Sequence, residues 1–351
     1  MRADRHAEPW AWAGRVGCVG RRIAVESGPM VLAGIDEAGY GPILGPLVVG
    51  CAAVEIEQAD PDDPPCLWTR LGATISRKRH RTGAKLHVND SKLVYSPATG
   101  LKELERSVLA VAASRGELPL DLHAFLAAVA PGCAGELAGH PWYAPARDEC
   151  FPVEVDATAA RLMAKALSDD MRAKGVGCCY LRAHVVGERQ YNRMVDATRN
   201  KASALFSLVA MHLDQLLRQF AGRRLVAFCD QQGGREHYGR LLRVMFEDWA
   251  LEVVREERGM SEYRLSKDSA AARLIFAEKA EGKCMPVALA SMLSKYLREV
   301  LMRRFNAWWG AAAPGVTPTA GYWQDGTRFL QETAQRRREL GIADADLIRQ
   351  R

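Results

Sequence analysis

Short apolar runs alternate along the chain with longer stretches in which apolar residues recur every three or four positions. The short runs are rich in valine and bounded by glycine, proline or acidic residues, which is typical of buried β-strands. We predict strands over 31–36, 46–55, 177–186, 224–229, 250–255 and 271–277, and a further short strand before Asp90. The longer stretches have the spacing of amphipathic helices. We predict helices over 98–113, 156–174, 200–220, 237–248, 286–308 and 326–340.

The alternation of strands and helices implies an α/β fold with a mixed central sheet flanked by helices. Residues 115–175 begin with a stretch rich in Pro, Gly and Ala that has weak periodicity, so we predict an insertion there. Residues 310–351 are predicted to form a C-terminal helical segment. Residues 1–30 carry five arginines in their first 29 positions and no strong periodicity. We interpret them as a flexible N-terminal extension or a misassigned start, followed by one domain over 31–351.

Composition excludes several classes of protein without naming a function. With 48% hydrophobic and 26% charged residues in 351, the chain is not of the disordered, collagen-like or coiled-coil classes. No apolar run is long enough to cross a bilayer, and no secretory signal is recognisable. Nine cysteines without a C-x-x-C pair predict reduced thiols in a cytoplasmic protein. The net charge of +6 permits a polyanionic partner.

Four carboxylates stand where the predicted strands end or a helix is about to begin. Asp36 and Glu37 close the first strand, Asp230 closes a later one, and Glu281 precedes the helix that Pro286 opens. Acids at buried strand ends are costly unless they are paired, and a divalent cation is the commonest partner of converging carboxylates. Oxygen ligands favour magnesium or manganese over zinc. An acid at a strand end is, taken singly, more often a turn or cap residue than a metal ligand, so a metal site requires that the four converge.

A glycine-rich loop follows the first strand and contains Gly39, Gly41 and Gly45. Its spacing is GxGxxxG, Pro42 interrupts it, and the neighbouring acids would repel a pyrophosphate, which argues against a dinucleotide-binding loop. Glycine lets backbone amides approach a ligand closely. The loop is therefore a candidate ligand-binding segment beside the acids.

Four motifs follow one another along the chain: GIDEAGYGPILGPLVVGCAAV (34–54), NDSKL (89–93), FCDQQGG around Asp230, and FAEKAEGKCMPVALASMLSKYLRE (276–299). In this order they resemble the type 2 ribonuclease H family, which includes ribonucleases HII and HIII. Glu281 lies fourteen residues before Lys295, which is the spacing in that family. The resemblance spans about 31–93 and 177–308.

The resemblance implies a ribonuclease H-like catalytic domain that cleaves the RNA strand of RNA–DNA hybrids and leaves 5′-phosphates. It implies that two Mg²⁺ or Mn²⁺ ions are held by Asp36, Glu37, Asp230 and Glu281. The nucleic-acid partner is expected to contact Gly39, Tyr40, Gly41, Ser91, Lys92 and Lys295, and a monomer is expected. For Lys295, pairing with acidic neighbours is an equal alternative.

The chain departs from the family pattern in several places. The string KAE (279–281) resembles ribonuclease HIII, as do Tyr191, Asn192, Asn200 and His212, yet the loop reads Gly-Tyr-Gly where HII has GRG and HIII typically GTG. The interval from the third acid to the fourth is longer than usual, which predicts an extra hairpin at about 250–270. These departures leave the strict substrate open.

Two residue sets have both a functional and an ordinary interpretation. The basic run from Arg77 to Lys85 is suited to phosphate contacts and equally to a solvated loop. Tyr322 loosely resembles a C-terminal tyrosine that HII proteins stack near the ribonucleotide. Two alternative functions stay open: a nuclease of the same fold for another nucleic acid, and a catalytically silent nucleic-acid-binding protein.

Overall fold

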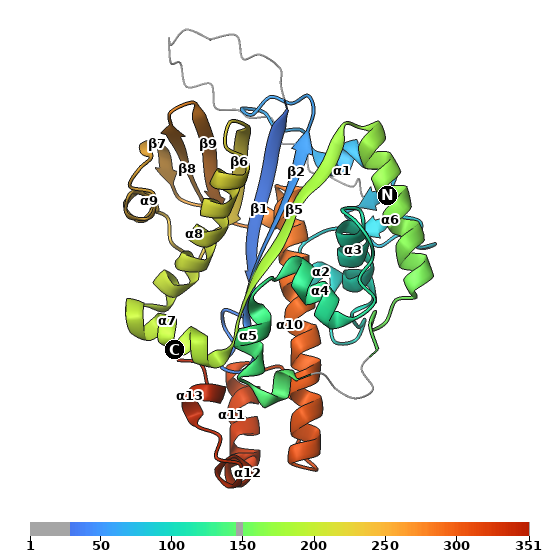
Figure 1. Cartoon of the computed structure of the whole chain (residues 1–351), viewed down its shortest axis with the longest axis vertical. Helices are drawn as coiled ribbons and strands as arrows, with labels where there is room; N and C mark the ends of the chain where they lie inside the picture. The colour runs from blue at the N-terminus through green and yellow to red at the C-terminus, as the bar shows by residue number, and fades with distance from the viewer. Residues whose placement is uncertain (1–28, 145–149, 351) are drawn as a thin grey trace, which may run out of the picture.

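A seven-stranded mixed sheet forms the centre of the protein (Figure 1), whose computed structural model describes residues 29–144 and 150–350. The strands lie in the order β5-β2-β1-β6-β9-β8-β7. Their bounds are β1 Met30–Ala38, β2 Leu47–Ile56, β5 Val176–Val186, β6 Arg224–Asp230, β7 Ala250–Glu257, β8 Met260–Lys267 and β9 Ala270–Ala277. A separate pair, β3 (Ile75–Ser76) and β4 (Leu86–His87), is parallel. The mixed α/β fold, the six main strands and the extra hairpin, β7 with β8, are confirmed.

The middle of the sheet is parallel. β1 pairs parallel with β6, and β6 pairs parallel with β9. On the other side of β1, β2 pairs antiparallel with β1, and β5 pairs antiparallel with β2. The carboxyl ends of β1, β6 and β9 therefore meet at one edge of the sheet, where α/β proteins commonly bind their ligands. These strands are nearly continuous apolar runs because both faces of a parallel sheet are covered.

Helices cover both faces of the sheet, and alternate residues of one strand enter the two cores. In β2, Val48 and Ala52 belong to one core, and Val49 and Cys51 belong to the other. The first core includes α10 (Met285–Ala312), α3 (Lys102–Ala113) and α6 (Ala157–Ala173). The second includes α8 (Lys201–Gln219), α7 (Glu188–Thr198) and α9 (Gly239–Met245). Figure 1 shows α8 in front of the sheet and α10 behind it.

Helix α10 approaches the sheet closely because glycines face it. A Cβ atom on Gly34 in β1 would lie 2.1 Å from the Val287 nitrogen, and one on Gly50 in β2 would lie 2.5 Å from Ser294 Oγ. The facing residues of α10 are small as well, among them Ser291. The backbone of the helix and that of the sheet therefore nearly touch, and the serines of α10 reach the end of β1.

Two predicted helices differ from the observed ones, and one observed helix was not predicted. The predicted helix 326–340 is two helices, α11 (Trp323–Glu332) and α12 (Ala334–Glu339), which meet at the buried Thr333. The predicted helix 237–248 is the shorter α9, because Phe246 leaves the helical conformation and is buried. Helix α7 was not predicted, because two of its four buried residues, Glu188 and Asn192, are polar and give no apolar stripe.

The remaining helices are short and lie between or after the strands. They are α1 Leu67–Arg70, α2 Ser91–Val94, α4 Leu122–Val129, α5 Cys133–Ala138, η1 Pro141–Tyr143, η2 Ala280–Gly282 and α13 Asp344–Leu347. Helices α11 to α13 gather at one end of the molecule, at the bottom of Figure 1. None of the helices in the described ranges has the length and apolar character needed to cross a membrane. Residues 1–28 of the predicted extension lie outside the described residues, and Met30 is the buried first residue of β1.

Candidate active site

Three of the predicted acids lie at or near the carboxyl ends of three adjacent parallel strands. Ile35 of β1 is paired with Cys229 of β6, so Asp36 and Asp230 come next in the same row. Asp230 is paired with Ala277, the last residue of β9, and Glu281 lies just beyond it in η2. The strand register therefore places acids from three distant parts of the sequence at one edge of the sheet.

Hydrogen bonds hold these acids in place. Asp230 Oδ1 accepts from the Ala280 N–H at 2.9 Å, and the side chains of Asp230 and Glu281 are hydrogen-bonded to each other. Asp36 accepts from the Glu37 N–H at 2.7 Å and from the Ser291 side chain. Ser291 thus ties the first acid to α10. Sequence reasoning did not single out this serine, although it stands in the small-residue motif that opens α10.

The DSK segment lies beside the acids. Asp90 caps α2 by accepting from the Lys92 N–H at 2.9 Å. The hydroxyl of the buried Ser91 is hydrogen-bonded at 3.0 Å to Ser291 Oγ, and Ser291 also binds Asp36. The positive charge of Lys92 lowers the pKa of Glu37, opposing the effect of burial. Ser91 and Lys92 therefore lie next to the acids, and their contact with a substrate stays a prediction.

Burial raises the pKa of all four carboxylates, and acidic neighbours raise that of three of them further. Burial raises the pKa of Asp36 well above its ordinary range, and the charges of Glu37 and Asp230 raise it further. Burial, followed by repulsion from Asp230, raises the pKa of Glu37 to about 7. Burial also raises the pKa of Asp230 and of Glu281, the latter with a contribution from Asp230. Such a cluster stores repulsion that a bound cation would offset.

We tested whether these residues suit a divalent cation. The donors are all carboxylate oxygens, and Glu281 Oε2 is buried without a hydrogen-bond partner in the described structure. Within residues 29–144 and 150–350, no three His, Cys, Asp or Glu side chains already form a metal cage. In charge and donor type the residues fit a hard cation such as Mg²⁺ or Mn²⁺.

The first two glycines of the glycine loop, Gly39 and Gly41, differ in their surroundings. Gly39 has a φ of +89°, and a Cβ there would lie 2.6 Å from the Pro46 carbonyl oxygen, so only glycine fits. Among the described residues, and apart from its two chain neighbours, nothing lies within 4 Å of a Cβ placed on Gly41. Between them, the ring of the half-buried Tyr40 lies 4.4 Å from Lys201 Nζ. Gly41 is thus an open approach to the loop backbone.

Two predicted substrate contacts are engaged within the protein. Lys295 Nζ donates to Glu299 at 2.6 Å and lies 4.8 Å from the Tyr95 ring centre, which matches the alternative interpretation of this lysine. Arg77, from the basic run, stacks 3.6 Å over the Trp68 ring and donates to the Gly282 carbonyl oxygen at 2.9 Å. Arg77 therefore supports the backbone next to Glu281, a role that sequence reasoning did not anticipate.

Tyr322 lies near the glycine loop. Its neighbour Gly321 accepts hydrogen bonds from the N–H groups of Ile43 at 2.8 Å and Leu44 at 3.3 Å. The Tyr322 side chain is 54% exposed, and the adjacent Trp323 is 49% exposed. An exposed aromatic pair thus flanks the loop.

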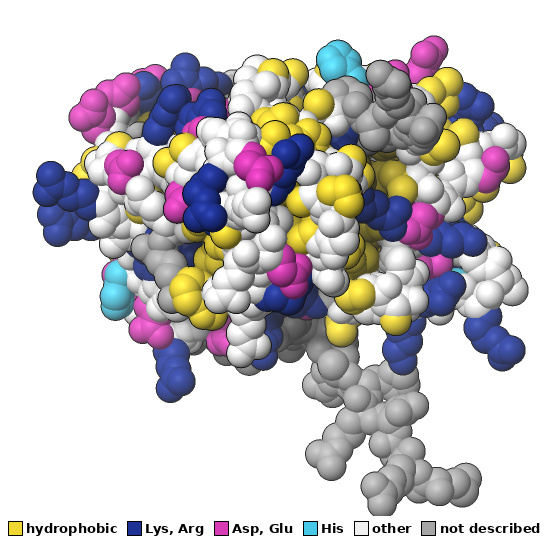
Figure 2. All heavy atoms as spheres, turned by 90° about the horizontal axis from the view of Figure 1, so that it is seen from below, with side chains coloured by type: hydrophobic (Ala, Val, Ile, Leu, Met, Phe, Trp, Pro, Cys, Tyr) yellow, Lys and Arg dark blue, Asp and Glu magenta, His cyan; other side chains and the backbone are white. Residues whose placement is uncertain are grey.

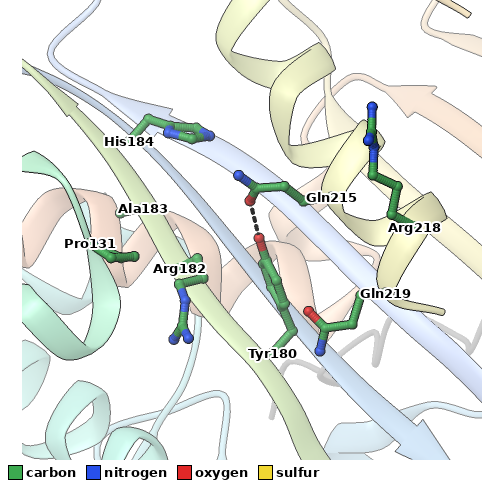
Figure 3. Close-up of a pocket in the computed structure, with 8 residues that line it drawn as sticks. All are labelled: Pro131, Tyr180, Arg182, Ala183, His184, Gln215, Arg218 and Gln219. Carbon is green, nitrogen blue, oxygen red and sulfur yellow. Dashed lines mark hydrogen bonds between the residues drawn. The ribbon is translucent and has the colours of Figure 1, made fainter.

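A cavity of about 440 Å³ lies elsewhere, between β5 and α8 (Figure 3). Tyr180 donates a hydrogen bond to Gln215 across it. Its two arginines point in different directions and are bound by protein groups: Arg182 donates to Ala128 O, and Arg218 donates to Asp214. None of the four acids lines this cavity. The candidate active site is therefore the carboxylate edge of the sheet.

No protein-family model and no curated protein matches the sequence. Solved structures do match. Ribonuclease HII from Archaeoglobus fulgidus, solved with PCNA, has 17% identity and a TM-score of 0.42, over 92% of this chain and 95% of that one. Ribonuclease H2 from Pyrococcus horikoshii has 14% identity and a TM-score of 0.37, over 91% and 92%. Bst-RNase HIII in complex with Mn²⁺ has 17% identity and a TM-score of 0.40, over 92% and 67%.

The chain resembles type 2 ribonucleases H. The likeness extends over about nine-tenths of its length and is a likeness of the backbone fold. The function proposed below rests on the residues of the site itself.

Proposed function

We propose that the protein is a metal-dependent endoribonuclease that cleaves the RNA strand of RNA–DNA hybrids. The observation that carries this proposal is the edge of the sheet where Asp36, Asp230 and Glu281 lie at or near the carboxyl ends of three neighbouring parallel strands, with Glu37 beside them. Burial raises the pKa of all four acids, and a bound cation would favour their ionisation together at neutral pH. Such a charged site without a bound ligand would only destabilise the fold, which weighs against a silent binding protein.

The four carboxylates would hold the divalent cations. Bound there, such ions activate a water for in-line attack on a phosphodiester and stabilise the leaving oxygen. The chain's own residues set the surroundings: Ser291 and the Glu37 N–H orient Asp36, and the Ala280 N–H orients Asp230. Lys92 supplies a positive charge on the side of Glu37, where a phosphate group would approach.

The glycine loop is the proposed reader of the sugar. RNA differs from DNA by the 2′-hydroxyl, which both donates and accepts hydrogen bonds. The backbone at Gly41 is open to an incoming group, because no described residue beyond its chain neighbours lies within 4 Å of its Cβ position. Tyr40 and the exposed Tyr322 are aromatic groups at the same loop that could stack against a sugar or base.

Cleavage assays with the full chain test the proposal. The substrates are an RNA–DNA hybrid, a DNA duplex with one ribonucleotide, an RNA duplex and a DNA duplex, each with Mg²⁺ or Mn²⁺. We expect cleavage of the RNA strand of the hybrid with a 5′-phosphate product, and none of the DNA duplex. Asp230→Asn should be inactive. Asp248→Asn, which changes an exposed acid just before the edge strand β7, should have the activity of the wild type. Equal cleavage of DNA would favour the alternative nuclease, and tight binding without any cleavage would favour the silent protein.

A further inference from the structure

Two nearly fully buried arginines bind the backbone of the glycine loop from its inner side. Arg298, on α10, donates to the carbonyl oxygens of Pro46 at 3.2 Å and Leu44 at 3.4 Å. Arg349, two residues before the end of the chain, donates to those of Tyr40 at 3.1 Å and Gly45 at 3.4 Å. Each arginine is only 2% exposed.

The rest of the loop backbone is held in the same way. The Arg349 N–H donates to the Ile43 carbonyl at 2.8 Å, and Gly321 O accepts from the N–H groups of Ile43 and Leu44. The Gly45 N–H donates to Glu188 Oε1 at 3.0 Å. Five carbonyl groups of the loop therefore accept hydrogen bonds from buried donors. They are those of Tyr40, Ile43, Leu44, Gly45 and Pro46. By contrast, the described hydrogen bonds include none from the Gly41 N–H.

The C-terminal end is itself fastened to the protein at several points. Asn192 of α7 donates to the carbonyl oxygens of Ala345 and Ile348, both at 2.8 Å, and accepts from the Gln350 N–H at 2.8 Å. The Arg349 guanidinium lies 4.3 Å from the Tyr191 ring centre. Two of the residues that resemble ribonuclease HIII, Tyr191 and Asn192, thus contact the end of the chain and not the carboxylates.

The charges within this network partly balance. Glu188 is fully buried, and it accepts hydrogen bonds from the Tyr143 hydroxyl and the Gly45 N–H. Burial raises its pKa to about 7, which the nearby positive charge of Arg349 opposes. Burial and the neighbouring Arg298 lower the pKa of Arg349 to about 10. Holding two guanidinium groups out of water costs free energy. We therefore expect the placement of their donors on the loop carbonyls to matter for the conformation of the loop.

The surface at the end of the molecule formed by α11 to α13 differs from the buried arginine network beneath it. Figure 2 views it from the side of α11 to α13 and shows basic and acidic side chains interspersed, with hydrophobic atoms between them. It offers no single-sign patch in this view. The buried arginines are thus not part of a surface for polyanions, and their partners are the backbone carbonyls of the loop.

We propose that Arg349 is a positioning residue: with Arg298, it makes the last residues of the chain a clamp that fixes the glycine loop in the conformation that reads the substrate sugar. The sugar-reading part of this inference rests on the proposed function. The clamp itself is a property of the fold and has its own readout. Arg349 would act through the loop backbone, since its guanidinium faces carbonyl groups and not the open side at Gly41.

The test compares Arg349→Lys with Arg336→Lys in the full chain. Lysine keeps the charge but cannot place donors on two carbonyls at once. Arg336 is a matched control in the same segment, because it is 44% exposed and binds Ala312 O and Glu339, away from the loop. Hydrogen exchange of peptides covering 39–46 is measured for both variants by mass spectrometry. We expect exchange in this loop to rise about tenfold in Arg349→Lys and to be unchanged in Arg336→Lys.

Kinetics supply the second readout. A loop displaced by a fraction of an ångström should lower kcat on the RNA–DNA hybrid about 10- to 100-fold while KM changes by less. Asn192→Ala loosens the end of the chain without touching the loop, so it should lower kcat in the same way but by less. It replaces Arg349→Lys in the test if that variant folds poorly. Unchanged exchange in 39–46 would overturn the clamp. Faster exchange with unaltered kcat would overturn the positioning role. A wild type inactive on every substrate would overturn the proposed function, and the exchange data would still judge the clamp.

Discussion

Replacing Glu37 by Gln should stabilise the protein in the absence of divalent metal. The change keeps the shape of the side chain and removes one of four crowded negative charges. The pKa of Glu37 is raised from its ordinary value of 4.5 to about 7. That difference corresponds to about 3 kcal/mol of unfavourable free energy once the group is ionised in the folded state. Glu37 is only partly buried, so water screens part of this and we expect a gain of about 2 kcal/mol at pH 8.

The sign follows from proton binding. Between pH 4.5 and 7 the folded protein binds a proton at Glu37 that the unfolded chain has already released, so wild-type stability falls as the pH rises through this window. Glutamine cannot titrate. Its advantage should therefore shrink to below about 1 kcal/mol at pH 5.

Urea unfolding in EDTA, followed by tryptophan fluorescence at pH 5 and pH 8, measures both values. Glu252→Gln, which removes an exposed carboxylate from β7, is the control and should change stability by less than about 0.5 kcal/mol at either pH. With Mg²⁺ at one fixed high concentration, the wild type should gain more stability than Glu37→Gln, because a ligand that binds the folded state more tightly stabilises it more. A gain of equal size at pH 5 and pH 8, or none at pH 8, would refute the idea that Glu37 is part of a repelling carboxylate cluster.

Three further changes separate the parts of the site. Asp230→Asn keeps the acceptor for the Ala280 N–H, so the fold should survive while cleavage falls more than about 100-fold, and the melting temperature should no longer rise with Mg²⁺. The added methyl of Gly41→Ala meets no described residue beyond its chain neighbours, so the melting temperature should not change. Gly41→Ala should slow hybrid cleavage more than Tyr40→Ala, whose loss of stacking is worth about 1–3 kcal/mol. Equal rates for both variants and the wild type would exclude the loop from substrate binding. Arg77→Met keeps the packing on Trp68 but loses the donor to Gly282 O, so the Mg²⁺ concentration for half-maximal cleavage should rise several-fold.

The sequence allowed the sheet and the position of the acids within it to be predicted for a physical reason. Strands buried on both faces are continuous apolar runs, and such runs can be recognised without knowing their neighbours. Asp36 and Asp230 each end one of these runs. Once the strands are parallel and adjacent, the register brings the two acids together.

Polar groups that act through tertiary contacts could not be predicted in this way. Glu188 and Arg349 are separated by 161 positions, and each lies in a segment whose polar composition is typical of a surface. Their burial depends on how α7 and the end of the chain meet the glycine loop, which no local pattern encodes. Arg77 is a similar case, because its place in a basic run suggests solvent or phosphate, whereas the fold gives it Trp68 and Gly282 as partners.

The small residues of the core connect the stability of the fold with the geometry of the site. Gly50 lets α10 approach β2 so closely that an added Cβ would lie 2.5 Å from Ser294 Oγ and 2.6 Å from the Ala290 carbonyl oxygen. Ser294 donates to the Asp36 carbonyl, and Ser291, one helical turn earlier, binds the Asp36 carboxylate. A larger residue at position 50 would push the helix outward and move both serines away from Asp36. Variants at this contact therefore change folding and the first acid together, whereas Gly41, whose Cβ position has no described residue beyond its chain neighbours within 4 Å, is where substrate recognition can be altered on its own.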